Sequence, residues 1–210
     1  PAASEPRDVA ACRALLALSR AQADRADPRI ERAILRSVAY YKPRLDTGID
    51  PAAAAALARA LALLYIRTND ARLSDLTFLL LDRFAAAQVR PEACPYPELR
   101  GAIQLRGPGL VGADTALYLA ALADGLALAE RIGDAPRVAR YREAVAAASR
   151  FVMQLEVRQA GCYFVRSPRD ALGGVRSAPW SSRLRADHCA DAVTALIQAR
   201  TALFGGHARP

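Results

Sequence analysis

The chain has 210 residues, of which 53% are hydrophobic, 24% charged and 6% aromatic, and its formal net charge is +8. That length can bury a substantial core, and the hydrophobic content excludes a disordered chain. No apolar run reaches the roughly 18 residues that a membrane-spanning helix needs. The charged residues that interrupt the candidate runs are Arg59, Arg67, Asp114 and Asp124.

The positive charge restricts the choice of partner. All basic residues except Lys42 are arginines, and they are spread evenly along the chain. A nucleic-acid surface is typically a basic patch interleaved with aromatic residues, so we expect no nucleic-acid partner. An acidic ligand remains open, because guanidinium groups bind carboxylates and phosphates through two hydrogen bonds.

Apolar residues recur at helical spacing through most of the chain and predict about seven helices. The first five cover 8–23, a segment from Pro28 to its stop at Pro43, 51–66, a partner carrying Leu73 to Phe84, and 115–132 after the cap residue Asp114. The last two begin after Gly133-Asp134 and at Asp187. A short strand-like segment is predicted at 162–165.

The lengths of the connections alternate. Tight turns at Asp27-Pro28, Asn69-Asp70 and Gly133-Asp134 join two helices each, and longer loops at 42–49, 90–112 and 156–186 join successive pairs. This pattern predicts an all-α fold of antiparallel helical hairpins, forming one domain over 1–210 that could be part of a longer chain. The pair starts are too unevenly spaced for a tetratricopeptide array.

Three segments carry a family resemblance. They are the helix over 116–125, the turn at 131–134 that leads into 140–144, and Gly173-Gly174-Val175-Arg176 followed by Asp187-His188. With these segments, residues 112–199 resemble part of an (α/α) toroid, the barrel of hairpins found in six-hairpin glycosidases, sugar epimerases and some polysaccharide lyases. The resemblance implies a partial toroid, since the chain supplies little more than half of the six hairpins.

In such a hairpin array, the three long loops are expected to share one rim and to direct their polar residues into one cavity. The acid/base candidates on this rim are Asp187, His188 and Glu98. The candidates for binding an anionic sugar are Arg176, Arg100, Arg166, Tyr163, Trp180 and Asp114. Guanidinium groups would hold carboxylates, and aromatic rings would stack on sugar rings.

Each acidic candidate also has an ordinary structural explanation. Asp187 and Asp114 could cap the helices that follow them, and His188 could be a first-turn residue with its polar atoms satisfied. Glu98 could form a salt bridge with Arg100 or another neighbour. If Glu98 instead pairs with Asp114 or Asp187, the two carboxyl groups could form a glycosidase-type pair.

The cysteines argue against a metal site. Cys12, Cys94, Cys162 and Cys189 have no CxxC spacing, and the adjacent His188 and Cys189 would point about 100° apart on a helix. We therefore expect neither a metal nor another cofactor. Cys94 and Cys162 could pair in an oxidising compartment, whereas Cys12 and Cys189 are typical of buried free thiols.

Residues 1–6 resemble the sequence that remains after a signal peptide, or a fragment boundary, so a periplasmic or secreted location is expected, with a cytoplasmic one left open. The leading functional hypothesis is a carbohydrate-directed protein of bacterial envelope or exopolysaccharide metabolism. It would bind an acidic glycan, or act on one as a glycoside hydrolase, polysaccharide lyase or sugar epimerase. The alternative is a non-catalytic helical-repeat scaffold that mediates protein–protein interaction.

Overall fold

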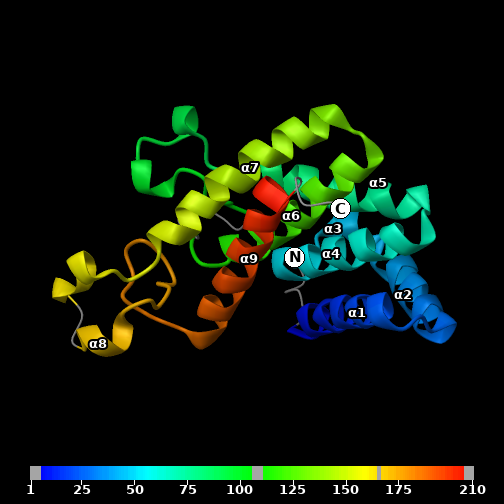
Figure 1. Ribbon diagram of the computed structural model, residues 1–210, viewed down its shortest axis with the longest axis horizontal. Helices are drawn as coiled ribbons and strands as arrows, with labels where there is room; N and C mark the ends of the chain where they lie inside the picture. Colours follow the sequence, from blue (N-terminus) through cyan, green and yellow to red (C-terminus); the bar gives the residue numbers. More distant parts are fainter. Residues whose placement is uncertain (1–5, 106–110, 165–166, 206–210) are drawn as a thin grey trace. The chain divides into compact units, whose positions relative to one another are not determined.

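The computed structural model describes residues 6–105, 111–164 and 167–205. These residues are mostly helical and contain no sheet, which confirms the predicted all-α class (Figure 1). No helix within these ranges combines the length and the apolar character needed to cross a membrane. The sequence predicted one domain over 1–210. By its internal contacts, the chain divides into two compact units, Pro1–Arg83 (unit 1) and Phe84–Pro210 (unit 2).

Unit 1 contains α1 (Pro6–Asp24), α2 (Pro28–Tyr41), the single turn α3 (Arg44–Thr47), α4 (Pro51–Thr68) and most of α5 (Ala71–Ala86). Helices α1 and α2 form an antiparallel hairpin. Accordingly, the hydroxyl of Tyr41 at the end of α2 donates to the carboxylate of Asp8 near the start of α1. Helix α4 packs along α1 in the parallel direction. Arg67 near the end of α4 donates to the carbonyl of Gln22 near the end of α1, at 2.7 Å.

The alanine-rich helix α4 is buried on almost all sides, as is usual for a helix that is apolar nearly all round. Small side chains allow neighbouring helices to approach closely, and the leucines of α4 fill the remaining core of unit 1. Even Arg59 in its middle is only 8% exposed.

Three helices begin where a capping aspartate precedes or borders a proline. The carboxylate of Asp50 accepts hydrogen bonds from the amides of Ala52 and Ala53, and Asp27 accepts one from Arg29. At the start of α7, the carboxylate of Asp134 accepts a hydrogen bond from the amide of Arg137. These bonds satisfy amides that have no partner inside the helix.

Unit 2 is built on α6 (Thr115–Ile132), α7 (Ala135–Gln154) and α9 (Ala186–Phe204). Helices α6 and α7 form an antiparallel hairpin across Gly133, whose φ of +81° closes the turn. Helix α9 packs along α6 (Figure 1). The segment around Ser177 lies beside the residues that precede both helices. There the Ala113 amide donates to the Ser177 carbonyl, and the Ser177 amide donates to Arg183.

Two long connections complete unit 2. The first follows α5 and contains the 3-10 turns η1 (Pro91–Ala93) and η2 (Pro97–Leu99). The second runs from 155 to 185 and contains the 3-10 helix η3 (Gln159–Phe164) and the single turn α8 (Pro168–Ala171). Isolated main-chain bridges fold it back on itself, and Val157, Cys162, Ala171 and Leu184 form a small core inside it.

The predicted strand-like segment at 162–165 is wrong where the structure describes it. Cys162 to Phe164 lie in η3, and the Cys162 thiol donates to the Arg158 carbonyl four residues earlier. An alternating apolar pair forms a strand only where another strand supplies the ladder of hydrogen bonds, and the described residues offer none here. Val165 lies outside the described residues.

All four cysteines are free, so Cys94 and Cys162 are not bonded to one another. Cys12 is fully buried, and burial raises the pKa of its thiol to about 11. It is therefore an uncharged core side chain at neutral pH.

Candidate functional site

One pocket of unit 2 joins residues that are far apart in the sequence. It has a volume of about 370 Å³ and lies between the end of α7, η2 and the turn after Arg176. We call it the Trp180 pocket; its lining is Glu98, Gln154, Leu155, Arg176, Pro179 and Trp180. The second and third predicted rim loops thus meet here. The remaining loop, 42–49, belongs to unit 1, and its part in a common rim stays a prediction.

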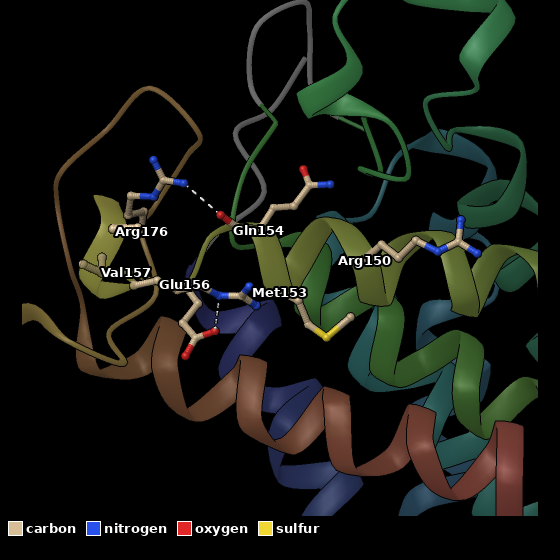
Figure 2. Close-up of a pocket in the computed structure, with 8 residues that line it drawn as sticks. Arg150, Met153, Gln154, Glu156, Val157 and Arg176 are labelled. Carbon is tan, nitrogen blue, oxygen red and sulfur yellow. Dashed lines mark hydrogen bonds and ion pairs between the residues drawn. The ribbon is translucent and has the colours of Figure 1, made fainter. Parts of the chain in front are cut away.

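A second hollow of about 640 Å³ shares Gln154 and Arg176 with the Trp180 pocket (Figure 2). It surrounds the last turn of α7 and the start of the connection that follows. Figure 2 shows Arg150 and Gln154 on the same side of α7, whereas Met153 points away from them. Glu156 in this hollow is paired with Arg158 at 3.0 Å, so its charge is already matched.

A third hollow, the arginine groove, runs along α7 opposite the loop 88–101 and has a volume of about 870 Å³. It shares Arg150 and Gln154 with the hollow of Figure 2. Its basic lining residues are Arg90, Arg100, Arg140, Arg142 and Arg150, and its acidic one is Glu143. The three hollows are thus adjacent around Gln154.

Several of these guanidinium groups are not used by the fold. The side chains of Arg90, Arg100 and Arg150 are exposed, and none forms an ion pair or hydrogen bond with any described residue. Arg142, by contrast, pairs with Glu130 at 2.6 Å. Three cationic groups are therefore available to an anionic ligand in one groove.

The loop wall of the groove is held close to α7. The Gln88 amide donates to the carbonyls of Gly101, at 3.1 Å, and Ala144, at 2.9 Å. Gly101 has a φ of +87°, and a Cβ there would lie 2.2 Å from the carbonyl oxygen of Ala147. Only glycine permits this approach, which places Arg100 next to the α7 face.

Arg176 ties the Trp180 pocket together. Its guanidinium donates to the carbonyls of Gln154, at 2.8 Å, Pro179, at 2.9 Å, and Leu155, at 3.4 Å. A cation at the carbonyl end of α7 is also favoured by the helix dipole. Because a guanidinium has five N–H groups, Arg176 holds the backbone beside Trp180 and still keeps donors for a ligand.

The other acidic candidates lie around Arg185. Asp187 is in the first turn of α9, and its carboxylate accepts two hydrogen bonds from Arg185, at 2.6 and 2.9 Å. These bonds lower the pKa of Asp187 to about 2, so the group cannot supply a proton at neutral pH. Asp114 is exposed at the residue before α6, makes no side-chain cap bond, and adds to the negative field at Arg185.

His188 follows Asp187 in α9 and is half-buried, with its Nδ1 unpartnered among the described residues. Neither His188 nor Asp187 lines the Trp180 pocket, so the structure does not bring them to Glu98 there. Glu98 is exposed, and within the described part of the chain it forms no ion pair with Arg100. The side chain of Tyr163 and the whole of Arg166 lie outside the described residues.

Sequence reasoning missed several lining residues, including Arg90 in the loop and Arg140, Arg150 and Gln154 on α7, where no site residue was predicted. The four-residue spacing of Arg150 and Gln154 places these two on one helix face, but only the folded loop shows that this face borders a groove. No group of three metal-ligating side chains occurs within the described ranges.

Comparisons with protein-family models, with curated proteins and with solved structures find no match.

Proposed function

We propose that unit 2 binds an acidic oligosaccharide, and that the protein serves bacterial envelope or exopolysaccharide metabolism in the periplasm or outside the cell. One observation carries the proposal. The Trp180 pocket adjoins a groove in which Arg100 and Arg150 have no partner among the described residues. A sugar ring would stack on Trp180, which is 61% exposed, while its carboxylates engage the free guanidinium groups.

Catalysis is the less supported part of this proposal. Hydrolysis of a glycosidic bond ordinarily needs two carboxyl groups on opposite sides of the bond. Glu98 is the one carboxylate in the lining of the Trp180 pocket, and Asp187 is held ionised by Arg185. The geometry therefore favours binding, with Glu98 as the residue to test for turnover of any sugar that binds. The partial toroid implied by the family resemblance stays part of this proposal.

Binding can be followed directly because Trp180 is the sole tryptophan of the chain. Its fluorescence should change on titration with an acidic oligosaccharide such as a galacturonate trimer, and should stay constant with a neutral trimer of similar size. Isothermal titration supplies the affinity. Absence of any signal with acidic sugars by both methods would contradict the proposal.

A matched pair of variants tests the role of the groove. Arg150→Ala should raise the Kd for the galacturonate trimer about tenfold, since one charge-assisted contact is lost. Arg200→Ala is the control, because Arg200 is also an exposed helical arginine without a described partner but lies on α9. Equal weakening by both variants would indicate a general charge effect.

A second candidate function is the non-catalytic scaffold. Helix α9 leaves Val193, Ile197 and Phe204 exposed by 58%, 61% and 76%, and their spacing places them on one face. An exposed apolar stripe of this kind favours a protein partner. Sedimentation of the pure protein and of Ile197→Glu would test whether that partner is another copy.

A further inference from the structure

We infer that the arginine groove holds a linear polyanionic sugar chain several residues long, lying along α7 and continuing from the Trp180 pocket. This inference rests on the proposed function and goes beyond it, because a single acidic sugar would need only one end of the groove.

The length of the charged face supports a chain rather than a monomer. Arg140, Arg150 and Gln154 all line the groove from α7. At 1.5 Å per helical residue, Arg140 lies about 15 Å along the axis from Arg150 and about 21 Å from Gln154. A ligand that contacts both ends of this face must therefore be an extended oligomer.

Small side chains line the part of the arginine groove between Arg140 and Arg150. Three alanines of α7 line the groove: Ala144, Ala146 and Ala147. Methyl side chains leave room for a chain to approach the helix, and Arg90 and Arg100 project from the facing loop. The groove thus offers cations on two walls, and the lining of α7 between Arg140 and Arg150 consists of small side chains, Arg142 and one carboxylate, Glu143.

The lining chemistry favours a sugar acid over a nucleic acid. Among the described residues, no aromatic side chain lines the arginine groove, and Trp180 belongs to the pocket at the other side of Gln154. Single-stranded nucleic acid is usually bound through successive stacking platforms beside a basic channel. Carboxylates on a polysaccharide need only the guanidinium forks that the groove provides.

Oligogalacturonates of increasing length test this inference, with Trp180 fluorescence and titration calorimetry as readouts. The expected result is a Kd about tenfold lower for the hexamer than for the dimer, with no further gain at the octamer. The gain should shrink as NaCl screens the charges.

Two variants locate the chain. Arg90→Ala and Arg140→Ala should each remove most of the gain between dimer and hexamer, whereas Arg200→Ala should leave it unchanged. Circular dichroism shows whether the variants keep their helices. Loss of the gain in both variants, with the helices intact, supports the inference, and an undiminished gain in Arg140→Ala would overturn the extension of the site along α7.

The outcomes separate the two proposals. If the dimer binds and the hexamer binds no more tightly, the extended groove site is overturned and binding at the Trp180 pocket stands. If no galacturonate binds, both fall. If an oligothymidylate or a polyglutamate peptide binds as tightly as the hexamer, the assignment to a sugar chain is overturned.

Discussion

Units 1 and 2 repeat one helical arrangement but differ in the loops that join their helices. In each unit an antiparallel hairpin is followed by a further helix that packs along the first, α4 on α1 and α9 on α6. The connection to that helix is short in unit 1, residues 42–50, and long in unit 2, residues 155–185. The shared arrangement is thus a matter of helix packing, and the difference lies in the loops.

Some charged side chains of unit 1 are paired within its own fold, whereas the exposed side chains of Arg25, Arg36 and Lys42 have no partner among the described residues. Arg44 pairs with Asp8 at 3.3 Å, and Arg67 contacts both Gln22 and Glu31. In unit 2, Arg90, Arg100 and Arg150 have no such partner among the described residues. What distinguishes Arg90, Arg100 and Arg150 is that all three line one groove. Under our proposal, they serve a ligand there.

The largest expected effect on the free energy of unfolding comes from substituting a glycine with positive φ. Gly101→Ala in unit 2 should lower the free energy of unfolding by about 3 kcal/mol, because its Cβ would collide with the Ala147 carbonyl. Gly48→Ala in unit 1 is the control, since it has a φ of +109° but open space around it, and should cost about 1 kcal/mol. Urea unfolding measures both. Equal costs would show that the close approach in unit 2 does not matter.

The next effect compares an arginine of each unit. Arg67→Ala should destabilise the protein by about 2 kcal/mol, because a charged hydrogen-bond donor to Gln22 is lost. Arg150→Ala should change the stability by less than about 0.5 kcal/mol, as for an unpaired surface residue. The same unfolding measurement applies. A large loss in Arg150→Ala would mean that this arginine serves the fold.

A smaller effect is expected from Arg176→Ala. Loss of its bonds to the backbone carbonyls should cost about 1.5 kcal/mol and should also alter the fluorescence of Trp180. Arg176→Lys, which keeps the charge but not the fork, should restore stability only in part. An unchanged Trp180 emission in Arg176→Ala would contradict the role of Arg176 in positioning the pocket.

The smallest effect is a pH dependence at Asp187. Arg185 lowers the pKa of this carboxyl from 3.8 to about 2, so ionised Asp187 stabilises the fold above about pH 4. That stabilisation is lost as the pH falls from about 4 towards 2. Wild type should therefore exceed Asp187→Asn in stability at pH 7, and the difference should shrink over that range. A difference that does not vary with pH would contradict the ion pair.

The sequence predicted the helices well because their signals are local. Capping aspartates, prolines at helix starts and the turn at Gly133 act within a few residues, and apolar spacing marks the buried faces. The strand-like segment at 162–165 failed for the complementary reason. A strand depends on a partner elsewhere in the chain, and sequence alternation alone does not supply one.

The site could be predicted only in part. Glu98, Arg176 and Trp180 were chosen for their chemistry, and the structure places them in one pocket. Asp187 and His188 were chosen in the same way but lie beside Arg185, away from that pocket lining. Arg150 and Gln154 were overlooked, since a helix face looks the same in sequence whether it borders water or a groove.

The sequence by itself therefore determined the helices, the hairpins at Asp27-Pro28 and Gly133-Asp134, and the excess of arginine. Tertiary structure alone decided which arginines remain unpaired and which of them share a groove. The physical reason is the distance along the chain over which the interactions act. Helix capping and amphipathic spacing involve near neighbours, whereas the groove depends on contacts between distant residues, such as the hydrogen bond from Gln88 to Ala144.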